Sequence, residues 1–467
     1  MIVMKFGGTS VGSAERIKTV ANIVSSYIKK GEKIVVVVSA MTSVTDRLIL
    51  CANYAENNNK ADYLKNYQIL KDLHIKTTKS LGLSKNNEKK LLDTIDNYFK
   101  DLKNILESVY SLRELSNRSL DLISSFGERL TIYLLSEAIK TLGIKAQPLE
   151  ATDLIVTDDN FGDANPLYKD STKKIKRIIP KLLSDQVIPV ITGFIGATKN
   201  RKITTLGRGG SDFSATIVGY CLDAKEVWIW TDVDGVMTAD PKIIKDAKTI
   251  KSISYDEAAE LSYFGAKVLH PRTIIPAELK NIPLRIKNTF NPKFEGTLIT
   301  NNKNGNGKGV KAITTIKYLV LVTLQGKGMI GIPGTAAKLF STLAEEKINV
   351  IFISQASSEH NISFVIKKED GHKTKNILNK AFQLELLNKR IEAIFMEDDV
   401  VILAVVGAGM KGRPGIAGKI FSALGDKNVN IIAIAQGSSE LNISLVLKST
   451  DLGKAVRNIH HAFNLGS

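Results

Sequence analysis

The sequence contains few cysteines and no long apolar run, and these absences narrow the classes of protein to which it can belong. Its two cysteines, Cys51 and Cys221, lie far apart without a CxxC spacing. We therefore expect neither a disulfide framework nor a zinc site, and a reducing, cytoplasmic setting fits best. No run of about eighteen apolar residues occurs, and the start MIVMKFGGTS lacks a basic segment followed by an apolar one. Neither a membrane partner nor a secretion signal is expected.

Arginine-rich stripes and interleaved aromatic residues are also lacking, although the formal net charge is +17. A cluster of Lys and Arg would attract nucleic-acid phosphates through counterion release. Here the lysines are spread along the chain among asparagines, so we predict a solvated basic surface and no nucleic-acid partner. Salt-dependent retention on duplex DNA would reveal the alternative.

What the sequence does contain is typical of a globular protein with several domains. It has 467 residues, of which 43% are hydrophobic and 24% charged. The apolar runs MIVMKFGG and KIVVVVSA flank a helical pattern from about residue 14 to 30, and further strand patterns follow in AQPLEA, VIPVITGFI and EVWIWTD. A helical, lysine-rich segment spans about residues 54–115. The alternation predicts an α/β fold with a doubly wound, mostly parallel sheet.

A duplicated unit follows the polar stretch NNKNGNGKG. INVIFISQASSEHNISFVI starts at Ile348, and the similar VNIIAIAQGSSELNISLVL starts 81 residues later, at Val429. Each copy reads as a ferredoxin-like βαββαβ unit. Each also contains GxGxxG, but the unit is too short for a dinucleotide-binding half, so we expect a tight turn facing a ligand carboxylate. The predicted domains are residues 1–305, 306–395 and 396–467.

Two glycine-rich segments could bind phosphate or carboxylate groups, since the chain has no GxxxxGK[ST] motif. In KFGGTSVG, Lys5 ends a strand, and Gly7 and Gly8 let backbone amides approach an anion. A plain strand-to-helix turn explains this segment equally well. In TTLGRGGSD, glycines surround Arg208 and precede Asp212, which favours a functional role because arginine binds carboxylates in bidentate fashion.

Three further segments carry charged residues at positions that allow a site. Asp232 and Asp234 follow the strand EVWIWT, where Mg²⁺ or a nucleotide could bind, although a DG turn is the competing explanation. Glu128 in SSFGERL and Lys267 in YFGAKVLHP lie beside glycines, and each alone could be a surface charge. His270 is interpreted as a structural residue.

Together, KFGGTSVG, SSFGERL, GRGGSD, WTDVDGVMTADP and FGAKVLHP resemble the aspartate kinases of the amino acid kinase superfamily, and the tail resembles paired ACT domains. The resemblance covers essentially the whole chain. It implies transfer of the γ-phosphate of MgATP to the β-carboxylate of L-aspartate, the first step of lysine, threonine and methionine biosynthesis. ATP and Mg²⁺ are the implied cofactors, and no residue is assigned as a dedicated metal ligand.

The resemblance also implies roles for individual residues. Glu128 would pair with the α-ammonium of aspartate and Arg208 with its α-carboxylate, and Lys5 and Lys267 would flank the transferred phosphoryl group. Asp212 would organise Lys5. The remaining implied contacts are Ser39, Thr45 and Ser211 with aspartate, and Gly7, Gly8, Thr231, Asp232, Asp234, Met237 and Lys242 with the nucleotide. Met237 departs from the tyrosine of several relatives, so an altered nucleotide affinity is expected.

The tail is most similar to the threonine-responsive type of aspartate kinase. Gln355 and Gln436 would bind an amino-acid effector, threonine or lysine, with Asn349 and Asn430 close by, although these amides could instead pair with each other within the repeat. A homodimer or homotetramer formed through the ACT domains is implied. Because the sequence stops at HHAFNLGS, a monofunctional enzyme is expected.

Two alternatives remain open on the sequence alone. One is a related kinase with another acceptor such as glutamate, and the other is an amino-acid sensor with a decayed kinase domain. The presence of Lys5, Glu128, Arg208, Asp212 and Lys267 favours an active enzyme over a sensor.

Overall fold

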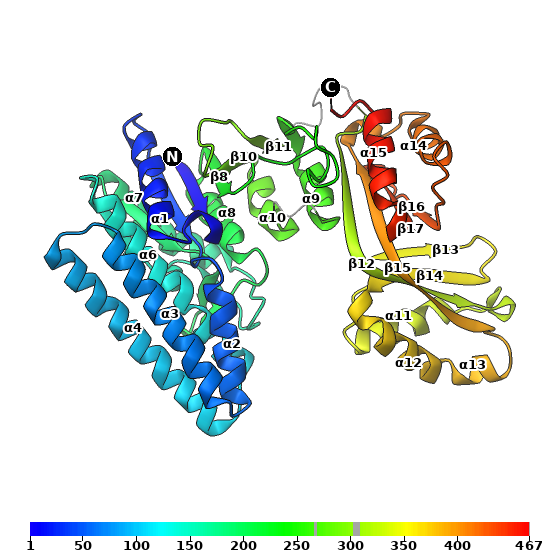
Figure 1. The fold of residues 1–467 in the computed structure, drawn as a ribbon, viewed down its shortest axis with the longest axis horizontal. Helices are drawn as coiled ribbons and strands as arrows, with labels where there is room; N and C mark the ends of the chain where they lie inside the picture. Colours follow the sequence, from blue (N-terminus) through cyan, green and yellow to red (C-terminus); the bar gives the residue numbers. More distant parts are fainter. Residues whose placement is uncertain (266–268, 302–308, 467) are drawn as a thin grey trace. The chain divides into compact units, whose positions relative to one another are not determined.

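The computed structural model describes residues 1–265, 269–301 and 309–466, and these form two compact units (Figure 1). The first unit comprises Met1–Val236, Lys251–Ala259 and Lys267–Asn302, and the second comprises Met237–Ile250, Glu260–Ala266 and Lys303–Ser467. The second unit thus includes two short segments that precede the duplicated region. The division at residues 305 and 395 stays a prediction.

The first unit is built on an eight-stranded sheet, as its alternating sequence pattern predicts. The strands are β1 (Ile2–Phe6), β2 (Ile34–Val38), β3 (Ala146–Leu149), β5 (Ile188–Thr192), β8 (Glu226–Thr231), β9 (Ser252–Ser254), β10 (Leu284–Asn288) and β11 (Thr297–Thr300). Their order is β3-β5-β2-β1-β8-β10-β11-β9, and all neighbours run parallel except β10 and β11. Every residue of β1 and β2 is buried, which explains why these strands are apolar throughout except at Lys5. The prediction of a mostly parallel α/β sheet is confirmed.

Helices pack against the sheet, and α1 and α10 each begin at a side-chain cap, whereas α6, α7 and α8 have none. They are α1 (Ala14–Ile28), α6 (Phe126–Lys140), α7 (Tyr168–Ser184), α8 (Gly210–Leu222), α9 (Tyr255–Tyr263) and α10 (Pro271–Leu279). The Ser13 side chain caps α1 by accepting a bond from Arg16 N at 3.3 Å. Helix α1 packs against α6, whereas α8 packs against α7 and α10. A small sheet of β4 (Val156–Thr157), β6 (Ile195–Thr198) and β7 (Ile203–Thr205) lies beside this core.

The lysine-rich segment near residues 54–115 is helical, as predicted, and it packs on one side of the first unit (Figure 1). It forms α3 (Lys60–Ser80) and α4 (Lys85–Leu112), between α2 (Val44–Glu56) and α5 (Asn117–Ser124). In α4 the buried residues recur at three- and four-residue spacing, at Leu91, Ile95, Phe99, Leu102 and Leu106. These side chains join the core of the first unit, while the lysines between them face solvent.

Within this helical layer, His74 of α3 is fully buried beside Phe99, and its Nε2 atom has no hydrogen-bond partner in the described part of the chain. Burial lowers the pKa of His74 from 6.5 to about 4, although the bond between Nδ1 and Leu70 O opposes this. The unfolded chain therefore binds a proton below about pH 6.5, whereas the folded chain resists protonation until about pH 4.

We expect the free energy of unfolding to fall by about 3 kcal/mol between pH 7 and pH 4 because of His74 alone. Urea unfolding of the full chain at both pH values measures the loss. His74→Leu, which cannot be protonated, should lose less stability over the same interval. Equal losses in the two proteins would show that other groups determine the acid sensitivity.

The second unit contains the duplicated sequence as one six-stranded sheet with helices. The first copy forms β12 (Ala312–Gln325), α11 (Thr335–Glu345), β13 (Phe352–Gln355), β14 (Asn361–Lys367), α12 (Gly371–Ala381) and α13 (Gln383–Leu387). The second forms β15 (Ala393–Val406), α14 (Ile416–Gly425), β16 (Ala433–Ala435), β17 (Asn442–Lys448) and α15 (Leu452–Ala462). The strand order is β13-β14-β12-β15-β17-β16.

The two copies share their longest strands, and this completes the ferredoxin-like pattern of each. Strands β12 and β15 both span 14 residues and pair antiparallel along their length. The first half of β15 lies beside the second half of β12, where Gln325 pairs with Ala393, and so supplies the last strand of the first copy. Conversely, Ala312 pairs with Val406, so the start of β12 supplies the last strand of the second copy. Each copy therefore needs the other to complete its sheet.

Candidate functional site

The carboxyl ends of the central parallel strands carry the first candidate residues. Lys5 is the fourth residue of β1, which pairs with β2 on one side and β8 on the other. Just beyond these strands, Ser39 N donates to Phe6 O at 3.1 Å and Gly7 N donates to Trp230 O at 3.2 Å. Lys5, Gly7 and Ser39 therefore lie at the same edge of the sheet, the edge at which open α/β sheets bind ligands.

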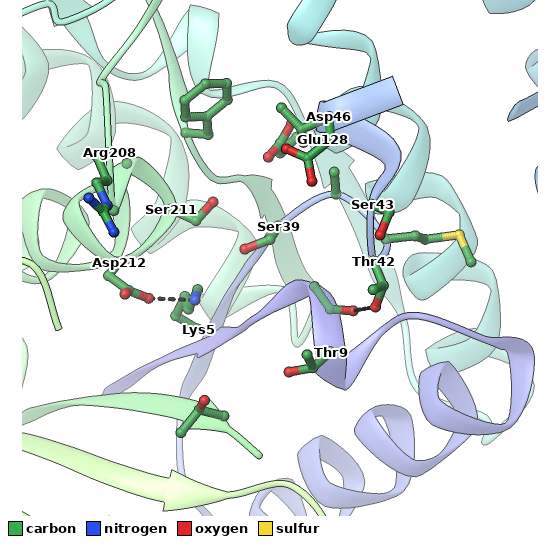
Figure 2. Close-up of a pocket in the computed structure, with 18 of the residues that line it drawn as sticks. Lys5, Thr9, Ser39, Thr42, Ser43, Asp46, Glu128, Arg208, Ser211 and Asp212 are labelled. Carbon is green, nitrogen blue, oxygen red and sulfur yellow. Dashed lines mark hydrogen bonds and ion pairs between the residues drawn. The ribbon is translucent and has the colours of Figure 1, made fainter. Parts of the chain in front are cut away.

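A pocket of about 540 Å³ opens at this edge (Figure 2). Its walls come from β1 and the turn after it, the segment from β2 into the first turn of α2, and the first turn of α6. The turn after β5, the loop before α8 with the first turn of that helix, and the end of β8 complete them. The predicted site residues that line it are Lys5, Gly8, Ser39, Thr45, Glu128, Arg208, Ser211, Asp212, Thr231 and Asp232. Segments from distant parts of the sequence thus meet around one cavity of a size suited to small molecules.

An ion pair in the wall of the pocket joins Lys5 of β1 to Asp212 of α8. Lys5 Nζ lies 2.5 Å from Asp212 Oδ1, and only 10% and 14% of the two side chains are exposed (Figure 2). Asp212 is in the first turn of α8, whose N-terminal amides also favour negative charge. The pair fixes a buried ammonium beside a helix N-terminus, an arrangement suited to holding an anionic ligand.

The loop that leads into α8 depends on its glycines. Gly207 and Gly209 have φ values of +71° and +73°, which other residues rarely adopt. A Cβ atom on Gly209 would also lie 2.6 Å from His270 Cβ. His270 itself caps α10, with Nδ1 accepting a bond from Arg272 N at 3.4 Å. This backbone presents Arg208 to the pocket.

Glu128 is the most unusual group in the pocket. It lies in the first turn of α6, is 3% exposed, and its Oε2 atom has no hydrogen-bond partner among the described residues. Burial raises the pKa of Glu128 from 4.5 to about 8, while a backbone bond from Ala40 and the charge of Lys5 oppose this rise. A buried carboxylate with a free oxygen facing a cavity costs free energy unless a cation or a donor binds it. The pocket therefore has a receptor for a positively charged group.

Close packing of α6 holds Glu128 in position. A Cβ atom on Gly127 would lie 2.6 Å from Ala40 Cβ and 3.2 Å from Val44 Cγ1. The helix can approach the segment between β2 and α2 only because residue 127 has no side chain.

We expect Gly127→Ala to lower the free energy of unfolding by about 1–3 kcal/mol and to weaken binding in the pocket, because α6 must move away. Chemical unfolding and ligand titration measure the two effects. Gly418→Ala is the matched control, since Gly418 is also helical and a Cβ atom there would meet no other atom within 4 Å. That variant should keep or slightly raise stability. Equal behaviour of the two variants would contradict the packing argument.

The candidate nucleotide residues are divided between different environments. Thr231 and Asp232 line the pocket, and Thr231 Oγ1 donates to Asp232 Oδ1 at 3.1 Å. Asp234 does not line it and instead accepts bonds at Oδ1 from the side-chain amides of Asn288 and Asn291, at 2.9 and 3.2 Å. The end of β10 and the loop after it therefore hold the carboxylate that follows β8.

Two further candidates belong to the second unit, and one lies outside the described residues. Met237 pairs with Thr249, whose Oγ1 lies 3.3 Å from Met237 Sδ. Lys242 follows in the same segment, where its backbone N donates to Asp240 Oδ1 at 2.9 Å. Lys267 falls within residues 266–268, which the structure does not describe.

The pocket also contains residues that sequence reasoning missed. They are Thr9, Ala40, Met41, Thr42, Ser43, Asp46, Phe194 and Gly210. Asp46 lines the same pocket as Glu128, so two carboxylates contribute to its wall. The polar run SAMTSVTD after β2 was an available signal, because side chains that follow a central parallel strand reach the ligand edge. Phe194 has no comparable signal in the sequence.

The predicted effector residues occupy equivalent positions in the two copies of the second unit. Gln355 ends β13 and Gln436 follows β16, and both side chains are exposed, as are Asn349 and Asn430. The outer strands that carry the glutamines approach each other, since Ser354 Oγ donates to Ile434 O at 3.5 Å. The two glutamines therefore lie at the ends of two strands that approach each other within one unit.

The glycine turns of the two copies are also equivalent. Gly331 N donates to Glu359 Oε2 at 2.9 Å, and Gly412 N donates to Glu440 Oε2 at 2.7 Å. A carboxylate of the chain itself thus bonds to each turn. In the described part of the chain, no helix is long and apolar enough to cross a bilayer, and no group of three or more His, Cys, Asp or Glu residues could hold a metal ion.

Comparison with known proteins gives consistent matches for both units. Residues 1–288 match the amino acid kinase family, and residues 322–382 and 403–463 match the ACT domain. The chain is 38% identical to bifunctional aspartokinase/homoserine dehydrogenase 1 of Zea mays over 99% of its own length and 50% of that protein. It is 34% identical to aspartokinase 1 of Arabidopsis thaliana, covering 99% of this chain and 80% of that one. The chain spans about half the length of the bifunctional relatives.

Solved structures agree with these matches over the full chain. Aspartokinase III of E. coli in complex with aspartate and ADP superposes with a TM-score of 0.82 and 26% identity, covering 99% of both chains. The same enzyme in complex with lysine and aspartate gives a TM-score of 0.81 and 27% identity, again over 99% of both chains.

Proposed function

Because the chain belongs to the amino acid kinase family, and within it to the aspartokinases, we propose that it is an aspartate kinase. It transfers the γ-phosphate of ATP to the β-carboxylate of L-aspartate and yields 4-phospho-L-aspartate and ADP. One observation supports this most directly: a buried, unpartnered Glu128 shares a pocket with Arg208 and the Lys5–Asp212 pair. A zwitterionic acceptor and an anionic donor require this combination of charges.

The acceptor binds through its charged α-groups. Glu128 pairs with the α-ammonium, and Arg208, with five donors in a planar fork, binds the α-carboxylate. Figure 2 shows these side chains on opposite sides of the pocket, with Ser39 and Ser211 between them. The hydroxyl groups of Ser39, Thr45 and Ser211 orient the bound aspartate, so that its β-carboxylate faces Lys5.

Phosphoryl transfer requires positioning and charge neutralisation more than a covalent intermediate. The ammonium of Lys5 neutralises charge on the phosphoryl oxygens, and Asp212 holds that ammonium in position through the ion pair. Gly7 and Gly8 let the backbone approach the phosphate oxygens, and Gly8 N is the donor because Gly7 N already donates to Trp230 O. Lys267 supplies a second cation. Thr231, Asp232, Asp234, Met237 and Lys242 bind the nucleotide.

Magnesium fits the residues that are present. Mg²⁺ commonly takes one or two carboxylates together with substrate phosphates and water, so a cluster of three acidic ligands is unnecessary. Asp232 is an exposed carboxylate at the pocket, and Thr231 engages only one of its oxygens. When bound, the ion neutralises the phosphate charges and orients them for in-line attack.

Amino acids regulate the enzyme through the ACT domains in this proposal. Gln355 and Gln436 bind the effector, which is threonine or lysine, and Asn349 and Asn430 assist. The lysine complex of the E. coli relative supports an amino-acid effector of this kind. Pairing of ACT domains between chains gives a homodimer or homotetramer.

Aspartate-dependent release of ADP by the purified full chain tests the proposal. We expect ADP with MgATP and aspartate, little with glutamate, and a lower rate when the effective amino acid is added. Threonine and lysine are tested separately. Amino-acid binding without ADP release from either acceptor would favour a sensor with an inactive kinase domain.

A further inference from the structure

Phe194 lines the pocket from a turn that is unfavourable for a phenylalanine. Its φ is +66°, and Ile195 N donates to Gly193 O at 2.8 Å across it. A hydrogen bond between residues i and i+2 defines a γ-turn, and the form with positive φ at its centre is rare and strained. For a bulky residue, positive φ is an outlier that persists only where the surroundings enforce it.

The surroundings enforce this turn from both sides. Gly193 N donates to Val38 O at 2.8 Å, and Leu206 N donates to Phe194 O at 2.8 Å, so the turn is tied to β2 and to the residue after β7. Residue 193 must be a glycine, because a Cβ atom there would lie 2.7 Å from Ser211 Cβ. The turn therefore has no freedom to relax away from the pocket.

The phenyl ring packs on the start of α8. A Cβ atom on Gly210 would lie 2.7 Å from Phe194 Cδ2, so the ring rests directly on the backbone that precedes Ser211. Phe194 is half-buried and lines the same cavity as Glu128, Arg208 and Ser211. It contributes a large, rigid, apolar group to a pocket whose other candidate side chains are mainly polar or charged.

A glycine would adopt this turn without strain, so the strained phenylalanine is explained by what its ring does in the pocket. Aromatic side chains fill volume with few rotatable bonds, and a ring held by Gly210 cannot move aside for a larger ligand. Ser43, also in the pocket, has a φ of +62°. Strained backbone thus occurs at two non-glycine positions around this cavity, as is common at ligand sites.

We propose that Phe194 determines the acceptor's specificity by limiting the length of the amino acid that fits between the anchoring charges and Lys5. The inference rests on the proposed function. With the α-groups held by Glu128 and Arg208, a glutamate has one more methylene to place, and a rigid ring in the wall of the same cavity would deny it that space. Aspartate leaves its carboxylate in line for transfer, whereas the longer acceptor is displaced.

The test compares aspartate with glutamate as acceptors for the wild-type chain and for Phe194→Ala. We expect the ratio of kcat/KM for aspartate to that for glutamate to fall at least about tenfold in Phe194→Ala, since one methylene in a fitted pocket is worth about 10–200-fold. Phe290→Ala is the matched control, because Phe290 is half exposed and does not line the pocket. Its ratio should equal that of the wild type.

A second variant and a second measurement separate specificity from folding. Phe194→Leu keeps an apolar side chain but removes the planar ring, and it should lower the ratio in the same direction. Added glutamate should raise the melting temperature of both variants more than that of the wild type. This shift measures glutamate binding independently of turnover. Equal losses of kcat/KM for both acceptors, with an unchanged ratio, would show a purely structural residue and overturn the inference. A wild type that releases no ADP with aspartate would instead overturn the proposed function.

Discussion

Lys5→Ala should abolish phosphoryl transfer while leaving the protein folded. Lys5 is 8% exposed, and its ammonium is the only described cation that is ion-paired with Asp212, at 2.5 Å. Removing it leaves the charge that develops on the phosphoryl group without a preorganised partner. We expect kcat to fall at least roughly 10²–10³-fold, the usual cost of losing one such group.

The measurement is aspartate-dependent ADP release under saturating MgATP, with circular dichroism and urea unfolding to verify the fold. Asp212→Asn should show a smaller loss of kcat, because the ammonium remains but is no longer held in place. Normal turnover by Lys5→Ala would refute the assignment of this pocket as the site of transfer.

Lys287 offers a matched control for the substitution of a buried lysine. It lies in β10 of the same sheet, is 5% exposed, and donates from Nζ to Phe294 O at 2.8 Å, with its ammonium over the Trp228 and Trp230 rings. Burial lowers the pKa of Lys287 to about 8. Lys287 does not line the pocket, so Lys287→Met should retain most of its turnover.

Local sequence patterns predicted the sheet and much of the pocket because both depend on short-range features. Buried parallel strands need continuous apolar runs, as in IVVVV of β2, and residues that follow such strands reach a common edge. Lys5, Asp232 and the glycines before Asp212 were recognisable for this reason. The recurrence of buried residues in α4 likewise followed from helical spacing.

Features that depend on contacts between distant segments could not be predicted in this way. The sharing of β12 and β15 between the two copies arises from long-range pairing, which the duplicated sequence does not encode locally. Phe194 looks like an ordinary strand residue in VIPVITGFI, and its positive φ results from bonds to Val38 and Leu206. The packing of residues 237–250 with the second unit, through buried Ala239 and Ile244, is equally invisible in the sequence.

Glu128→Gln should raise the free energy of unfolding at high pH and, at the same time, weaken the binding of aspartate. In the wild type the folded pKa of Glu128 is about 8, against 4.5 for an ordinary glutamate. Below pH 4.5 Glu128 is protonated in both the folded and the unfolded chain, so folding buries no charge at this residue. As pH rises from 4.5 to 8, the unfolded chain loses a proton that the folded chain keeps, and above pH 8 the folded state contains a buried charge. Stability should therefore fall as pH rises, by roughly 5 kcal/mol in total.

The neutral amide of Glu128→Gln avoids this penalty, so at pH 8–9 the variant should unfold at higher urea concentration than the wild type. At pH 5 the difference should be small. The same variant should lose aspartate binding, with KM for aspartate raised roughly 10²–10³-fold, the expected effect of removing one partner of a buried ion pair. KM for ATP should stay near the wild-type value, because Glu128 contacts only the amino acid in the proposed arrangement.

The pH profile of the wild type gives an independent test of the same group. Since free enzyme must ionise Glu128 before it binds the α-ammonium, kcat/KM for aspartate should decrease as pH falls below about 8, whereas kcat at saturation should change little. Glu128→Gln should lack this dependence. A variant that gained no stability at pH 8–9, yet still bound aspartate normally, would show that the orphan carboxylate is not the receptor for the ammonium. Gained stability together with lost binding would show that the enzyme keeps a destabilising charge in its pocket because the substrate requires it.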